Sequence, residues 1–230
     1  MSESWIERTD VQDGMRRMLA RRAEMIGGGD GAFGWKLGFG APTWLEKFAI
    51  PGPLVGFLPE SRRHPPGATV SVEGWHNPVA EPEIALFLGA DLNHPDQAAE
   101  AVAAVAPAIE LADVHLPPED MAEVVAGNIF HRAVILGAPD SGRSGGDISG
   151  LQAHITRDGS EEAVVTDLEA LTGELISTLA HTARLLEAFD ERLRAGEVVI
   201  MGSVTPPLPI HPGTEIGFRL APLPTITVSV

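Results

Sequence analysis

The chain has 230 residues, 44% of them hydrophobic, which is typical of one folded globular domain and excludes a disordered protein. Its formal net charge of −16 argues against nucleic acid and anionic membranes as partners, because both bind basic patches. The absence of cysteine excludes disulfides, thiol catalysis and cysteine-ligated metal sites. With no signal sequence and no apolar run of about 18 residues, we expect a cytoplasmic protein.

The N-terminal part of the chain predicts one helix followed by strands. A helix is expected over residues 4–26, with Val11, Met15 and Met18 on one face and arginines on the other, and three glycines end it. Residues 33–40 alternate apolar side chains with glycines and one lysine, which predicts a strand. Further strands are expected over 67–75 and 81–88.

The rest of the chain is rich in strands. A helix is expected from 96 to about 105, and strands are expected in "PAIELAD" (107–113) and over 131–137. A leucine stripe predicts a second long helix over about 167–194, and three strands, "VVIMGS", "TEIGFRL" and "TITVSV", follow it. This balance predicts a mixed, β-rich α+β domain with the helices outside the strands.

Three carboxylates lie within apolar strand segments. On the expected strand 81–88, Glu81 and Glu83 point to the same face, about 7 Å apart along the backbone. Pro82, between them, lacks an N–H, which is typical of an edge or rim that a ligand can reach. Glu110 lies between Ile109 and Leu111 on a separate strand. If the three share a pocket, a hard divalent cation such as Mg²⁺ or Mn²⁺ would cancel their repulsion; otherwise they are ordinary solvent-facing glutamates.

Lys36 is the other candidate for a chemical role. The chain has few lysines among its 16 basic residues, and Lys36 stands inside a strand between glycines that would let a substrate approach the backbone. A partly buried ammonium near acids can move a proton or bind an anion. The alternative is an exposed lysine on the wet face of an antiparallel strand.

The ordered motifs resemble a known family. From about residue 34 to the C-terminus, "GWKLG", "GPLVGFL", "EPEIALFLGADL", "PAIELADVH", "AGNIFHRAVILG" and "AGEVVIMGSVTPPLPIHPGTEI" are similar to the fumarylacetoacetate hydrolase superfamily, above all its 2-keto-4-pentenoate hydratase and 4-oxalocrotonate decarboxylase group. The resemblance implies a mixed β-roll like that family's C-terminal domain. It also implies one catalytic domain over 1–230, with 1–64 as a helix-plus-strand segment and 65–230 as the metal-binding core.

The resemblance also implies a chemistry. One Mg²⁺ or Mn²⁺ would be held by Glu81, Glu83 and Glu110, and a 2-keto acid would bind to it, so that the metal stabilises an enolate as a Lewis acid. The family's lysine matches Lys36, which would move a proton. Ser203 and Thr205 would line the carboxylate end of the substrate.

The chain departs from the family at a second acid/base position. Gly127 stands where hydratases carry an aspartate, although the adjacent Asn128 is retained as a substrate-binding candidate. Glu60, or Asp113 together with His115, is therefore expected to supply further proton transfer. Of the remaining histidines, His131 also lies in a motif, where a hydrogen-bonded structural role is expected.

These features predict a hydratase acting on a 2-hydroxy-alka-2,4-dienoate. The alternatives are decarboxylation of a vinylogous 2-keto acid, hydrolytic cleavage of an acylpyruvate, and a non-catalytic member of the family that binds a keto acid. The methionine stripe of the first helix and the family resemblance further predict a homo-oligomer, a dimer or larger.

Overall fold

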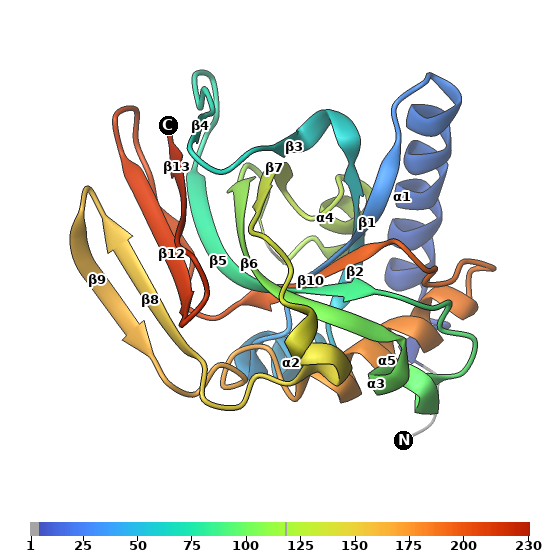
Figure 1. Cartoon of the computed structure of the whole chain (residues 1–230). Coiled ribbons are helices and arrows are strands. Elements are labelled where there is room, and N and C mark those ends of the chain that lie inside the picture. The colour runs from blue at the N-terminus through green and yellow to red at the C-terminus, as the bar shows by residue number, and fades with distance from the viewer. Residues whose placement is uncertain (1–4, 118) are drawn as a thin grey trace.

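The computed structural model describes residues 5–117 and 119–230, and its strands form two curled, mixed sheets (Figure 1). The larger sheet has eight strands in the order β2-β1-β10-β5-β6-β7-β3, and β11 pairs with β5 beside that path. Its members are β1 (Ala32–Gly38), β2 (Leu54–Pro59), β3 (Arg63–His64), β5 (Pro78–Leu88), β6 (Val102–Asp113), β7 (His131–Leu136), β10 (Val198–Ser203) and β11 (Leu208–Pro209). The expected α+β fold, a mixed β-roll with peripheral helices, is confirmed.

The smaller sheet packs across one end of the larger one. Its order is β4-β13-β12-β8-β9, and β12 and β13 contact β6. Its strands are β4 (Ala68–Thr69), β8 (Gln152–Arg157), β9 (Ser160–Val165), β12 (Glu215–Ala221) and β13 (Ile226–Ser229). Figure 1 shows the β8–β9 hairpin at the side of the molecule away from the first helix.

The helices lie outside the sheets. They are α1 (Thr9–Gly27), α2 (Pro42–Phe48), α3 (Ala98–Ala101), α4 (Met121–Ala126) and α5 (Leu175–Glu187), with short 3₁₀ turns η2 (Glu60–Arg62), η3 (Pro95–Gln97) and η4 (Ser141–Gly146). The helix α5 packs on β10 and α3, and α1 packs on α4. No helix within 5–117 and 119–230 has the length and apolar character that crossing a membrane requires.

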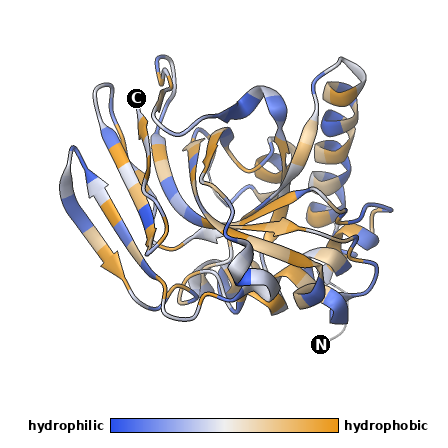
Figure 2. Cartoon of the chain, in the orientation of Figure 1, coloured by the Kyte–Doolittle hydropathy of each residue, from blue (hydrophilic) through white to orange (hydrophobic). Residues whose placement is uncertain are grey.

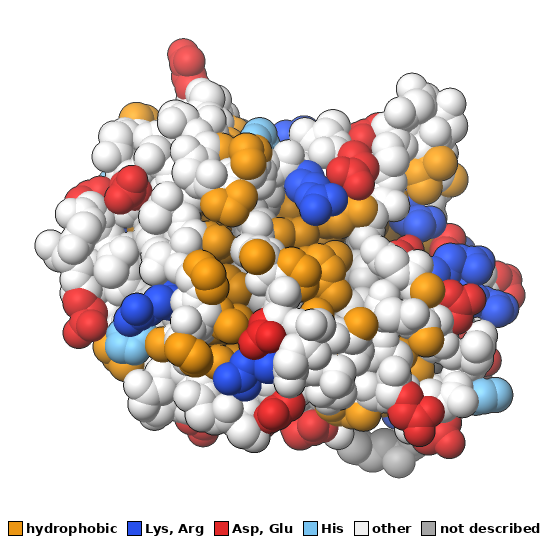
Figure 3. All heavy atoms as spheres, in the orientation of Figure 1, with side chains coloured by type: hydrophobic (Ala, Val, Ile, Leu, Met, Phe, Trp, Pro, Cys, Tyr) orange, Lys and Arg blue, Asp and Glu red, His pale blue; other side chains and the backbone are white. Residues whose placement is uncertain are grey.

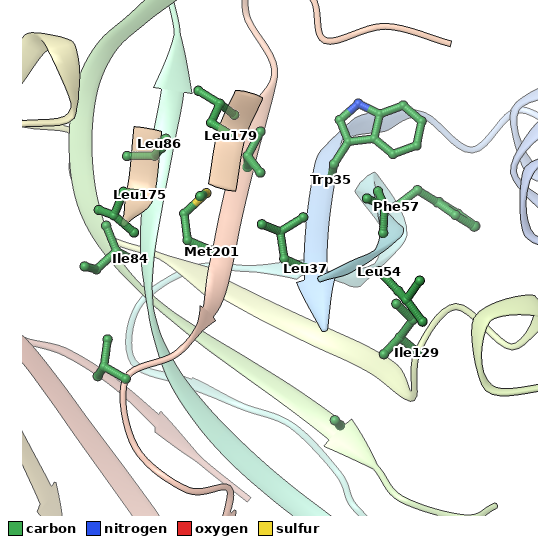
Figure 4. Packing of buried hydrophobic residues seen from close by; sticks show 14 of the residues in the cluster. Trp35, Leu37, Leu54, Phe57, Ile84, Leu86, Ile129, Leu175, Leu179 and Met201 are labelled. Carbon is green, nitrogen blue, oxygen red and sulfur yellow. The ribbon is translucent and has the colours of Figure 1, made fainter. Parts of the chain in front are cut away.

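One continuous hydrophobic core joins the two ends of the chain. It runs from Val11 on α1 to Val228 on β13, and Figure 4 shows Leu37 of β1 beside Met201 of β10 within it. Figure 2 shows the hydrophobic residues concentrated on the central strands, whereas the β8–β9 hairpin carries mixed hydropathy. Because β1 pairs with both β2 and β10, the segments 1–64 and 65–230 share one sheet.

The predicted N-terminal helix is confirmed from Thr9 to Gly27, whereas residues 5–8 of the expected range are not α-helical and residue 4 lies outside the described residues. Val11, Met15 and Met18 are fully buried. Gly14 allows α4 to come close, because a Cβ there would lie 3.0 Å from the Ala122 carbonyl oxygen. The methionine stripe is therefore covered by the chain itself, so it no longer supports the expected homo-oligomer.

The helix expected from 96 to 105 is wrong over its second half. Only Ala98–Ala101 is α-helical, and Val102 begins β6, the long strand that pairs with β5 on one side and β7 on the other. Alanines in this segment have high intrinsic helix propensity, but burial between two partner strands outweighs it. The strand even includes Pro107, whose missing N–H removes one ladder hydrogen bond.

Other boundaries also differ from the sequence-based expectation. Of the strand expected over 67–75, only Ala68–Thr69 is a strand, because the chain then turns at Gly74 with φ 79°. The helix expected over 167–194 spans Leu175–Glu187. The sequence reading did not identify the hairpin of β8 and β9 or the short helices α2 and α4, all of which are short elements with weak periodicity.

The close pairing of β1 with β10 can be tested with a matched pair of glycine substitutions. A Cβ at Gly34 would lie 2.0 Å from the backbone oxygen of Val198, whereas a Cβ at Gly27 would meet nothing within 4 Å. We expect Gly34→Ala to destabilise the protein by at least about 2 kcal/mol, since the strands must separate. Gly27→Ala should be neutral or slightly stabilising. Urea denaturation would measure both, and equal effects would contradict the assigned register.

Candidate metal centre and its cavity

Three carboxylates converge where β5 and β6 pair. Glu81 lies directly opposite Glu110 in the ladder, and Glu83 is two residues further along β5 on the same face. One carboxylate oxygen from each lies within 4.8 Å of the others. Glu110 and Glu83 are 0% and 1% exposed, and Glu81 is half-buried. The predicted solvent-facing alternative is therefore wrong for Glu83 and Glu110.

Lys36 joins this group from β1. It is 2% exposed, and its Nζ donates to Glu110 Oε1 at 2.7 Å and to the Ile129 carbonyl oxygen at 3.0 Å. The neighbouring strand leaves room for its stem at Gly56, where a Cβ would lie 3.1 Å from Lys36 Cγ and 2.6 Å from Asn128 Oδ1. Lys36 is thus a buried, paired ammonium and not a surface lysine.

His131 is a fifth member of the cluster. Its Nδ1 lies 2.8 Å from Glu110 Oε1, and burial lowers the pKa of His131 despite that contact, so the ring is neutral and donates through Nδ1–H. The sequence reading assigned His131 a hydrogen-bonded structural role and did not place it beside Glu110. The available signal was a polar residue at the start of the apolar strand "HRAVILG", next in the sheet to the strand that carries Glu110.

Burial and mutual repulsion shift the pKa values of the three carboxylates in different directions. Burial and the Glu110 charge raise the pKa of Glu81 to about 7, and burial with both neighbouring carboxylates raises the pKa of Glu83 well above its usual range. Burial opposes the ionised form of Glu110 too, but Lys36 and His131 outweigh it and lower the pKa of Glu110. Burial likewise opposes the charge of Lys36, yet the three carboxylates raise the pKa of Lys36.

The donor set fits a hard divalent cation. When ionised, the three carboxylates and one ammonium carry a formal charge of −2, which a divalent ion would neutralise. Glu110 Oε2 is buried without a hydrogen-bond partner among the described residues, although its other oxygen accepts from both Lys36 and His131. An unpaired, buried carboxylate oxygen is costly unless a further ligand uses it.

Glu81 and Glu83 open onto a cavity of about 370 Å³, whereas Glu110 is fully buried and is not among the residues that line it. Of the sequence-predicted residues, Lys36, Glu81, Glu83, Ser203 and Thr205 line it. Figure 3 shows that hydrophobic side chains gather in the middle of the face drawn there, with charged side chains mainly towards its edges. The buried Thr205 hydroxyl has no hydrogen-bond partner in the described part of the chain, and a ligand in the cavity would satisfy it.

Glu60 and Asn128 lie outside this cavity. Glu60 is exposed in η2, where its Oε1 is 3.8 Å from Arg63 Nη1. Asn128 is buried, and its side-chain amide pairs with the backbone of Phe57 as a neighbouring strand would. Its Oδ1 accepts from the Phe57 N–H at 2.7 Å, and its Nδ2 donates to the Phe57 carbonyl oxygen at 2.9 Å. Both its polar atoms are used by β2, so the structure gives Asn128 a structural contact in place of the expected substrate contact.

Asp113 and His115 also lie apart from the cavity. Asp113 Oδ1 accepts from the backbone N–H groups of His76 and Asn77, and its Oδ2 accepts from Arg132 at 3.1 Å. These bonds lower the pKa of Asp113 although burial opposes them, so it is a fixed carboxylate. His115 lines a separate cavity of about 90 Å³, as does Gly127, so position 127 is not part of the wall of the larger cavity.

Comparison with known families identifies this arrangement. Residues 41–230 match the family model described as fumarylacetoacetate (FAA) hydrolase C-terminal. The chain belongs to the fumarylacetoacetate hydrolase family. The match includes all three carboxylates and the Ser203–Thr205 segment, and it begins just after the strand that carries Lys36.

Individual relatives within the fumarylacetoacetate hydrolase family carry two kinds of name. The chain is 27% identical over 219 residues to a 4-oxalocrotonate decarboxylase of a Pseudomonas species, covering 93% of this chain and 83% of the relative. It is 26% identical over 208 residues to 2-hydroxyhexa-2,4-dienoate hydratase of Comamonas testosteroni, covering 87% and 78%.

A solved structure shares the fold. The 4-oxalocrotonate decarboxylase from Pseudomonas putida G7, complexed with magnesium and adipate, superimposes with a TM-score of 0.84 at 24% identity, covering 98% of this chain and 88% of the other. A second structure of that enzyme is complexed with calcium and acetate.

The raised carboxylate pKa values predict that metal binding depends on pH. Without metal, Glu81 holds a proton below pH about 7, and the raised pKa of Glu83 also favours its protonated form, so a cation must displace protons to bind. We expect the Mn²⁺ affinity to rise with pH through 7, about tenfold per pH unit for each displaced proton. Calorimetry in buffers of different ionisation enthalpy would measure affinity and proton release together. A dissociation constant unchanged from pH 6 to pH 8 would contradict the assignment.

Proposed function

We propose that this chain is a divalent-metal-dependent hydratase that acts on a 2-hydroxy-alka-2,4-dienoate or the corresponding 2-keto acid. The observation that carries the proposal is the cluster of Glu81, Glu83 and Glu110 with Lys36 paired to Glu110 at the wall of the cavity. A dienoate needs its negative charge stabilised at the oxygen end and a proton delivered along the carbon chain. The cluster offers a site for each of these.

We assign different roles to the site residues according to their positions in the cavity. Glu81, Glu83 and Glu110 would hold Mg²⁺ or Mn²⁺, which supplies Lewis-acid stabilisation of charge on the substrate oxygens. Ser203 and Thr205 line the cavity and would bind the substrate carboxylate, for which the unpaired Thr205 hydroxyl is available.

Proton transfer is assigned to Lys36. Lys36 lines the cavity, so its ammonium would donate a proton to the substrate carbon chain; a bound divalent cation would offset the carboxylates that raise the pKa of Lys36 and so make it a better acid. We assign no proton transfer to Glu60, Asp113 or His115, since none of them lines the cavity.

Decarboxylation of a vinylogous 2-keto acid is the second candidate. It is favoured by the name of the Pseudomonas relative, and it would use the same charge stabilisation and the same lysine. The two reactions differ in whether water is added or carbon dioxide is lost, so product analysis separates them.

The proposed reaction can be tested directly. A 2-hydroxy-alka-2,4-dienoate incubated with the protein and Mn²⁺ should lose its ultraviolet absorbance, and a chelator should stop the loss. We expect Glu83→Gln to reduce the rate by roughly 10² or more, because it removes a metal-ligand charge. Glu100→Gln makes the same charge change at an exposed position on α3 and is the control. No turnover of a dienoate, a vinylogous 2-keto acid or an acylpyruvate with either metal would contradict the proposal.

The role of Lys36 can be separated from binding. Lys36→Met at saturating metal should lower kcat by roughly 10² or more and leave KM nearly unchanged, since proton transfer acts in the transition state. Lys47→Met, which removes an exposed lysine, is the control. A rise in KM with unchanged kcat would show instead that Lys36 binds the anionic end of the substrate.

We further propose that residues 1–230 act as one catalytic domain and form a homo-oligomer. Of the large hydrophobic side chains in the described residues, only Ile26 and Val164 are exposed, each at 44%, so the interface would use half-buried side chains. Light scattering at micromolar concentration should give at least twice the 24.3 kDa chain mass. A mass of one chain would contradict this expectation.

A further inference from the structure

The cavity wall is polar at the carboxylate cluster and apolar over most of the rest. The polar groups lie close together, because the three carboxylates are within 4.8 Å of one another and Lys36 is 2.7 Å from Glu110. The remaining wall is formed largely by Phe39, Trp44, Phe130, Leu171, Pro206 and Pro207. A ligand held at the cluster must therefore extend its other end along apolar side chains.

The aromatic part of this wall is fixed in place. The Phe39 and Trp44 rings meet edge to face with centroids 5.3 Å apart, and Trp44 stacks on Phe48 at 5.4 Å. Phe39 and Phe130 both have left-handed backbones, with φ 62° and 64°, which is rare for bulky residues and costs free energy. A strained backbone conformation persists only where the surrounding packing enforces it. We therefore take the position of these aromatic side chains to be fixed by the fold.

Positive charge is scarce around this wall. Among the described residues that line the cavity, Lys36 is the one cation, and its ammonium is already bonded to Glu110 and to the Ile129 carbonyl oxygen. Lys47 lies outside the lining, with its Nζ 4.9 Å from the centroid of the Trp44 ring and 2.7 Å from Glu119 Oε1. A second carboxylate on a ligand would lie against mainly apolar side chains, with no free cation among the lining residues to pair with it, which is unfavourable.

We propose that this cavity selects 2-keto acids with one carboxylate and an uncharged, apolar tail, and discriminates against dicarboxylates of the same length. The inference rests on the proposed function, because it assumes that the keto acid end binds at the metal cluster. Each methylene of the tail buried against the wall should raise the affinity about fourfold. A terminal carboxylate in place of an apolar group should lower it at least tenfold.

The test compares two ligands of matched shape. In 5-methyl-2-oxohexanoate an isopropyl group replaces the distal carboxylate of 2-oxoglutarate, and neither ligand has the double bond on which water addition acts. Calorimetry with saturating Mn²⁺ should show the monocarboxylate binding at least tenfold more tightly. Leu171→Arg, which places a cation in the apolar wall, should reverse or abolish this preference, whereas Leu171→Met should retain it.

The outcomes separate the inference from the proposed function. If neither ligand binds in the presence of metal, the proposed function fails and the inference fails with it. If both bind but 2-oxoglutarate binds as tightly or more tightly, the proposed function stands and the inference is overturned. In that case Lys47→Met would show whether Lys47 turns from Glu119 to the distal carboxylate, because the variant would then lose 2-oxoglutarate binding selectively.

Discussion

The structure is organised around the repulsion among three clustered carboxylates, two of them fully buried. Glu81, Glu83 and Glu110 lie too close together to ionise fully in an apolar environment, and Lys36 cancels only one of their charges. The ion pair of Lys36 with Glu110 is almost completely buried, and removing one partner of such a pair is strongly destabilising. The remaining deficit of positive charge would favour a divalent cation at the cluster, and this expectation underlies the proposed function.

Several backbone features serve to hold Lys36 in this position. Residues 128–130 form a consecutive left-handed turn, with φ 67°, 48° and 64°, which is rare for β-branched and aromatic residues. The turn directs the Ile129 carbonyl oxygen at Lys36, and Asn128 holds it against Phe57 through two hydrogen bonds. Asn128 therefore acts on the site through the backbone that it positions, which explains a polar residue buried away from the cavity.

Asp113 shows how a plausible sequence assignment can fail. It is the last residue of β6, the strand that also carries Glu110, and it lies two residues before a histidine, as a catalytic pair could; it is 1% exposed. Its carboxylate oxygens are occupied by two backbone N–H groups and by Arg132. A sequence identifies a residue that could transfer a proton. It does not show the hydrogen bonds that already occupy the carboxylate, because these come from segments distant in the chain.

The sequence by itself determined the chemical identity of the centre: the spacing of Glu81 and Glu83, the isolated Glu110, and a lysine between glycines. These features follow from local rules. Strand periodicity determines which side chains share a face, and a charged residue within an apolar strand segment indicates a special role because burying an unpaired charge is costly. Only the tertiary structure decided that β1 lies between β2 and β10 and that His131 contacts Glu110. It also decided that the alanine-rich start of β6 is a strand and not a helix. These outcomes depend on partners far away in the sequence, 74 residues in the case of Lys36 and Glu110, and non-local ladders and ion pairs outweigh local propensity there.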